Sequence, residues 1–134
     1  MAKRIRILIA KLGLDTHTIG ITVVAHALRD AGMEVIFSGL KQTPEMVVRT
    51  AIQEDADVVG LSSLSAAHMS HFASVLALLK EHGADDKLVI GGGVIPEEDA
   101  DALRKAGVAE IFTMGTETSR IVDYIEKWWA AQDR

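Results

Sequence analysis

The stretch IRILIAKLGLDTHTIGITVVAHALRDAG, residues 5–32, decides the fold because its hydrophobic pattern changes partway along. Residues 5–10 are almost continuously apolar, which is typical of a strand covered on both faces of a parallel sheet. After a polar loop, residues 19–31 carry apolar side chains at helical spacing, and Gly32 follows as a helix stop. The stretch therefore predicts a strand followed by a helix, the unit from which parallel sheets are built.

The same unit recurs along the rest of the chain. Further short apolar runs, each bounded by Gly, Asp or Ser, predict strands at residues 35–37, 58–61, 88–90 and 110–112. Helical patterns predict helices at residues 43–52, 69–81, 96–107 and 119–131. In the first of these, Thr43 and Pro44 suit the N-cap and first helical position, and we expect the inner face to be Met46, Val47, Ala51 and Ile52.

This alternation predicts an α/β protein with right-handed crossovers and helices on both faces of a parallel sheet. Five strands in 134 residues indicate one domain over residues 1–134, with the flavodoxin-like strand order 2-1-3-4-5. Ligands of such sheets bind beyond the carboxyl ends of the strands, at the switch point between strands 1 and 3.

Composition excludes several classes of function. The chain has no cysteine, which excludes disulfides, zinc–thiolate sites, iron–sulfur clusters and cysteine nucleophiles. The net charge of −5 argues against a nucleic-acid partner or an anionic membrane surface. No run of about 20 apolar residues could span a membrane, and no cleavage site follows the apolar start. We expect a cytoplasmic protein.

Four segments meet at the carboxyl edge of the predicted sheet. They are polar, small or rich in glycine, so that backbone can approach a ligand closely and hydroxyls and amides are free to bind it. These segments are residues 11–20, 62–65, 91–96 and 113–116.

The first segment contains a candidate metal ligand, His17, with Asp15 two residues before it. In extended chain both point to the same side, so Asp15 can accept a proton from one imidazole nitrogen while the other faces a metal. Lys11 could in turn balance Asp15. One histidine is too few for zinc but suffices where a macrocycle supplies the other ligands, which points to haem or a corrin. Taken alone, Asp15 could instead cap the following helix.

Other proteins with this fold class fit the sequence less well. A response-regulator receiver needs an Asp at the end of its third strand, where this chain has Leu61 and Ser62. A flavodoxin needs a phosphate-binding loop after the first strand, where Asp15 would repel phosphate. A nicotinamide-dinucleotide domain needs the glycine fingerprint G-x-G-x-x-G after that strand, and it is absent.

Three short motifs together resemble a known family. Asp15-x-His17-x-x-Gly20, then Ser62-x-Leu64, then Gly92-Gly93 is similar to the three-part signature of B12-binding domains. These domains occur in the methylmalonyl-CoA mutase, glutamate mutase and methionine synthase families. The resemblance covers the chain from residue 5 to about residue 124.

The resemblance implies a specific mode of cofactor binding. The dimethylbenzimidazole tail of cobalamin would leave the cobalt and enter a pocket beside the sheet, and His17 would become the lower axial ligand. Asp15, with Lys11 behind it, would tune His17, and Ser62 would hydrogen-bond the buried base beside Leu64. Other implied cofactor-binding residues are those in the first loop, at the glycine pair and in the last loop: Thr16, Thr18, Ile19, Gly20, Gly92, Gly93, Phe112, Gly115 and Thr116.

Finer features resemble the acyl-CoA mutase branch: KLGLDTH (residues 11–17), SSLSAAH (62–68) and GGVIP (92–96). That branch uses adenosylcobalamin for radical isomerisation of an acyl-CoA. This chain is too short for the substrate-binding (β/α)₈ barrel, which needs about 250 residues. The resemblance therefore implies a large partner subunit that binds the acyl-CoA, and no catalytic residue in this chain.

The size of the chain resembles the small subunits of split mutases. The chain is most similar to the small subunits of 2-hydroxyisobutyryl-CoA mutases, and ALRDAGMEVIFSGL (residues 27–40) and VVRTAIQEDADVVG (47–60) strengthen this resemblance. Some methylmalonyl-CoA mutases are also divided in this way and remain an alternative. The first strand begins too close to residue 1 for the helical cap that precedes this domain in methyltransferase corrinoid proteins. A non-catalytic cobalamin carrier remains an alternative.

Overall fold

A computed structural model describes residues 4–11, 19–38, 42–63, 68–93, 95–113 and 116–132, with the backbone alone described at 19–21, 63, 68, 69 and 113. Strands and helices alternate along these residues, as the sequence predicts. In chain order they are β1 (Arg6–Lys11), α1 (Ile19–Asp30), β2 (Glu34–Phe37), α2 (Pro44–Gln53), β3 (Val58–Ser63), α3 (His68–Glu81), β4 (Leu88–Gly93), α4 (Glu97–Ala106), β5 (Glu110–Thr113) and α5 (Thr118–Ala131).

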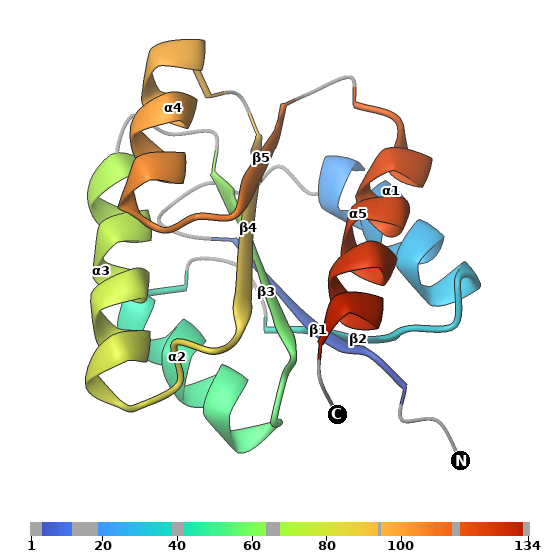
Figure 1. Ribbon diagram of the computed structural model, residues 1–134, viewed down its shortest axis with the longest axis horizontal. Coiled ribbons are helices and arrows are strands. Elements are labelled where there is room, and N and C mark those ends of the chain that lie inside the picture. The colour runs from blue at the N-terminus through green and yellow to red at the C-terminus, as the bar shows by residue number, and fades with distance from the viewer. Residues whose placement is uncertain are drawn as a thin grey trace.

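The strands form one parallel sheet in the order β2-β1-β3-β4-β5, which confirms the flavodoxin-like prediction. Helices α1 and α5 cover one face of the sheet, and α2, α3 and α4 cover the other (Figure 1). Since all strands run in the same direction, their carboxyl ends lie along one edge. The predicted switch point between β1 and β3 lies at that edge.

Each face of the sheet has its own hydrophobic core, because successive strand side chains point to opposite faces. On β1, Ile7 and Ile9 pack in the α1/α5 core, whereas Leu8 and Ala10 pack in the core under α2, α3 and α4. Full burial of an aliphatic side chain of this size contributes about 1.5–3 kcal/mol. The same alternation continues along β4, where Leu88 and Ile90 pack in the α1/α5 core and Val89 packs in the other.

Helix α2 begins as predicted, but its buried face is narrower than expected. The Thr43 hydroxyl accepts a hydrogen bond from the Met46 N–H at 3.2 Å, and Pro44 occupies the first helical position. The buried residues of α2 are Val47, Val48 and Ala51. The prediction that Met46 and Ile52 face inward is wrong, because these side chains are 41% and 42% exposed. They flank the stripe that packs on the sheet and α3, so helical periodicity alone overestimates its width.

Several strands continue further toward the carboxyl edge than the apolar pattern predicts. Ser62 and Ser63 belong to β3, and the glycines at 91–93 belong to β4. Backbone pairing does not require apolar side chains, so the ladder continues with Ser62 opposite Gly92 and Ser63 opposite Gly93. Residues expected in loops therefore sit on rigid strand ends.

Charged groups link α4 to the amino end of β5. The Glu110 Oε1 atom accepts hydrogen bonds from Arg104 Nε at 2.6 Å and from the Ile111 N–H at 2.9 Å. Partial burial tends to raise the pKa of Glu110, but these two hydrogen bonds and the Arg104 charge outweigh it and lower that pKa. The Glu110 carboxylate in turn raises the pKa of Arg104.

None of the described helices has both the length and the apolar character needed to cross a membrane.

Candidate functional site

Four of the predicted site residues lie in one row across the sheet. Lys11 of β1 pairs with Ser62 of β3, Ser62 pairs with Gly92 of β4, and Gly92 pairs with Phe112 of β5. These residues are far apart in the sequence, and parallel strand register brings them side by side. The row runs across the carboxyl edge of the sheet.

All four residues of this row point toward helices α1 and α5. Ile9, two residues before Lys11, and Ile90, two residues before Gly92, both pack in the α1/α5 core. Because strand side chains repeat every second residue, Lys11, Ser62 and Gly92 share that face. Phe112 also packs against the α1/α5 core. The row thus lies between the sheet and these two helices, at the carboxyl edge of the sheet.

Lys11 is unusual because a lysine side chain is only 1% exposed here. An ammonium group is costly to bury unless charged or polar groups compensate it. The Lys11 carbonyl accepts a hydrogen bond from the Gln42 N–H at 3.0 Å, which joins the chain after β2 to the end of β1. The fold therefore buries a lysine at the end of β1, in the row at the carboxyl edge of the sheet.

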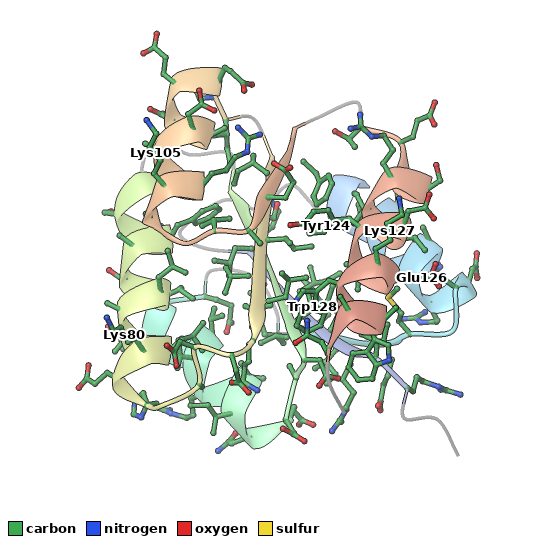
Figure 2. The ribbon with its side chains drawn as sticks, in the orientation of Figure 1. Lys80, Lys105, Tyr124, Glu126, Lys127 and Trp128 are labelled. Atoms are coloured by element: carbon green, nitrogen blue, oxygen red, sulfur yellow. The ribbon has the colours of Figure 1, made fainter. Side chains whose placement is uncertain are left out.

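An aromatic pair closes the β5 end of the row. The rings of Phe112 and Tyr124 meet edge to face with centroids 5.6 Å apart. Tyr124 lies on the side of α5 that faces the sheet (Figure 2), and its hydroxyl lies 3.3 Å from the Ala109 carbonyl, to which it donates a hydrogen bond. Burial raises the pKa of Tyr124, and the nearby Glu110 charge raises it further. The phenol remains a neutral donor that fixes α5 against β5.

The glycines at the end of β4 serve different purposes. A Cβ atom at Gly91 would lie 2.6 Å from Phe72 Cε2, so Gly91 makes room for the core under α3. A Cβ at Gly92 would lie 3.2 Å from the Phe112 carbonyl oxygen, a tight but smaller conflict. Gly93 has a φ of 123°, which other residues rarely adopt. Of the three, Gly92 lies on the α1/α5 face, in the row with Ser62.

The other predicted site residues fall into two groups. Ile19 and Gly20 form the first turn of α1, which follows the carboxyl end of β1, and partly buried Thr116 precedes α5. Both places lie at the same edge as the row. The remaining predictions lie outside the described residues: Asp15, Thr16, His17, Thr18, Leu64 and Gly115.

The sequence interpretation did not single out Gly60, which lies two residues before Ser62 and shares its face of β3. A Cβ there would approach Ile7 and Ile9, two residues of the α1/α5 core. The signal was present in the sequence, since a glycine interrupts the apolar run of residues 58–61. A glycine inside a strand often marks the close approach of another group.

The row offers groups suited to holding a ligand. It combines a buried lysine, a hydroxyl, glycine backbone and an aromatic side chain on the ends of neighbouring strands. A polar-tipped group entering beside the sheet would find hydrogen-bonding atoms at the edge and apolar surface below them. The arrangement favours binding and orientation of a ligand.

Comparison with known proteins shows similarity over nearly the whole chain. The family model described as the B12 binding domain matches residues 5–123. The small subunit of 2-hydroxyisobutanoyl-CoA mutase from Aquincola tertiaricarbonis is 55% identical over 128 residues, which cover 96% of this chain and 94% of that protein. The similarity thus extends over nearly the whole of both chains.

Two further matches place the similarity in context. Methylmalonyl-CoA mutase from Cereibacter sphaeroides is 46% identical over 114 residues, or 85% of this chain, but these residues make up only 16% of that protein. The crystal structure of a cobalamin-binding protein from Desulfitobacterium hafniense superimposes with a TM-score of 0.81 at 24% identity. It covers 94% of this chain and 60% of the other, and at that identity it supports the fold alone.

Proposed function

The chain belongs to the B12-binding domain family, and we propose that it is the cobalamin-binding small subunit of an adenosylcobalamin-dependent acyl-CoA mutase. The observation that carries the proposal is the 55% identity over nearly its whole length to a mutase small subunit. We assign cofactor binding to the carboxyl edge of the sheet, and the row from Lys11 to Phe112 supports this assignment by bringing four predicted site residues together. In this proposal residues 1–134 act as one domain.

The described residues fit a cofactor with a nucleotide tail. Gly92 places backbone without a side chain on the face toward α1 and α5, Ser62 beside it supplies a hydroxyl, and Phe112 supplies an apolar side chain. We assign Ser62 to hydrogen-bond the base of the tail, with Leu64 beside it. Around them, contacts to the tail and corrin are assigned to Gly20, Gly93, Gly115, Thr116, Thr16, Thr18 and Ile19.

His17 is assigned to the cobalt of the cofactor, which its imidazole would ligate, and Asp15 would orient that imidazole. A carboxylate on the far imidazole nitrogen fixes the tautomer and makes the ligand more basic. Buried Lys11 lies at the start of the same segment, where a carboxylate such as Asp15 would stabilise its charge. Adenosylcobalamin supplies the radical that starts the isomerisation. This chain holds and orients the cofactor.

The substrate and the reaction barrel are assigned to a large partner subunit. The methylmalonyl-CoA mutase relative contains a similar domain as 16% of its length, so in that protein most of the chain serves other tasks. We assign binding of the acyl-CoA to the partner and binding of the cofactor to this chain. The assignment to 2-hydroxyisobutanoyl-CoA follows the higher identity of that small subunit.

Reconstitution tests this function. The purified chain, the large mutase subunit of the same organism and adenosylcobalamin are combined with 2-hydroxyisobutanoyl-CoA or methylmalonyl-CoA. Isomeric products are separated by chromatography, because isomerisation leaves the mass unchanged. We expect turnover of 2-hydroxyisobutanoyl-CoA that requires all three components. Turnover of methylmalonyl-CoA alone would assign the other substrate, and cofactor binding without any turnover would identify a carrier.

A further inference from the structure

Gly60 lies in the middle of β3, the central strand of the sheet (Figure 1). It pairs with Ile9 on one side and Ile90 on the other, directly below the row that contains Ser62. Both of these neighbours pack in the α1/α5 core. Gly60 thus places no side chain on the α1/α5 face of β3, two residues before Ser62.

The fold itself does not require glycine at this position. The nearest atoms to a Cβ at Gly60 are the Leu8 carbonyl oxygen at 3.7 Å, Ile7 Cδ1 at 3.9 Å and Ile9 Cγ1 at 3.9 Å, all ordinary contacts. The φ of Gly60 is not among the positive values. The other sheet glycines differ, because packing of Phe72, the Phe112 carbonyl or a positive φ constrains each of them.

Glycine in a strand interior is unfavourable for folding, since its backbone loses more freedom and it adds no packing surface. An alanine at residue 60 would fit and would bury a methyl group against two isoleucines. Glycine at residue 60 therefore lowers the stability of the fold, and packing within the protein does not offset this effect. Room for a bound ligand is a physical reason for glycine at this position.

We propose that Gly60 is a specificity-determining residue that sets the depth of the tail pocket, admitting the aromatic base of the cofactor's nucleotide tail beneath Ser62. This inference rests on the proposed cobalamin-binding function. The base would pack against the backbone at Gly60, and Ser62 would hydrogen-bond its polar edge. A side chain at residue 60 shortens the pocket and blocks a corrinoid that has a tail, but not one that lacks it.

The test compares two corrinoids on the full chain, with the large subunit present in every sample. Cobalamin carries the nucleotide tail and cobinamide lacks it. Affinities are measured by titration for the wild type, Gly60→Ala and Gly60→Val, and thermal midpoints are measured without cofactor. Gly91→Ala is the matched control, since it adds the same methyl group to the neighbouring strand but toward the opposite face.

We expect Gly60→Val to bind cobalamin at least about tenfold more weakly, the equivalent of one overpacked contact, with cobinamide affinity within about twofold of the wild type. Gly60→Ala shows the same trend, with a thermal midpoint equal to or above that of the wild type. Gly91→Ala shows the reverse, a lowered midpoint with near-normal cobalamin affinity.

Equal cobalamin affinity in the wild type and both Gly60 variants would overturn the inference. A parallel loss of both corrinoids would also overturn it, because the block would not depend on the tail. Should Gly60→Val fail to fold, Gly60→Ala gives the same comparison. Failure of the proposed function is distinct: the wild type itself would then bind neither corrinoid.

Discussion

Gly91 of β4 lies directly against the ring of Phe72 on α3. A Cβ atom at Gly91 would come within 2.6 Å of Phe72 Cε2 and 2.8 Å of Ile111 Cδ1. Phe72 is fully buried in the core under α2, α3 and α4. The contact shows that glycine at residue 91 is required for packing α3 on the sheet, on the face opposite the proposed pocket.

Gly91→Ala should therefore destabilise the fold by about 1–3 kcal/mol, the usual cost of overpacking a core. The free energy of unfolding is measured in urea. Combining it with Phe72→Leu removes the ring that the new methyl meets, so the double variant should lose less than the sum of the two single changes. Strict additivity would contradict the close contact.

Thr43→Ala should lower stability by about 1 kcal/mol, because the hydroxyl accepts the Met46 N–H at the start of α2. Thr43→Ser keeps that oxygen and should remain close to the wild type. Thermal unfolding followed by circular dichroism compares the three proteins. If alanine and serine gave the same midpoint, the hydroxyl would not be acting as a cap.

Glu110→Gln should cost about 1 kcal/mol near pH 7, since the carboxylate accepts bonds from Arg104 and the Ile111 N–H. The folded protein lowers the pKa of Glu110 from its ordinary 4.5, so the folded state favours the ionised form. The stabilisation is present above pH 4.5 and is lost as the pH falls through the lowered folded pKa.

Urea unfolding at several pH values measures this dependence. The difference between wild type and Glu110→Gln should shrink as the pH falls below about 4.5. Exposed Glu126 on α5 (Figure 2) provides the control Glu126→Gln, for which the difference should be small throughout. A difference for Glu110→Gln that grows on acidification would refute the assigned pKa direction.

Ser62→Ala should weaken cobalamin binding about two- to tenfold while leaving stability nearly unchanged. The range corresponds to the loss of one hydrogen bond of about 0.5–1.5 kcal/mol. Calorimetric titration measures the affinity. Thr50→Ala removes a hydroxyl from α2 on the other face and is the matched control. A control that weakens binding as much as Ser62→Ala would show that the effect is indirect.

The sequence predicted the fold well because its signals are local. Apolar runs marked each strand, and Gly32, Gly83 and Gly107, which adopt positive φ, marked helix ends. The ends of the strands were less well predicted, because serine and glycine continue the ladder without an apolar side chain. Met46 and Ile52 were misplaced because periodicity does not reveal how wide a contact the neighbouring helix makes.

The site was predicted only in part from the residues themselves. Register decides that Lys11, Ser62, Gly92 and Phe112 form one row, and register depends on contacts between distant parts of the chain. Knowing that Gly91 packs against Phe72 and that Gly92 lies on the opposite face, beside the Phe112 carbonyl, requires knowing which face each occupies. That Ser62 and Gly92 belong to a binding motif was predicted from the family resemblance.

The measurement that tests the central claim most directly is the visible absorption spectrum of cobalamin bound to this chain, with the large subunit present. Wild type and His17→Ala are compared, and haem serves as the non-corrin control. We predict a spectrum in which the tail base has left the cobalt and a histidine has replaced it, with the histidine signature lost in His17→Ala. An unchanged cobalamin spectrum with the wild type would contradict the account.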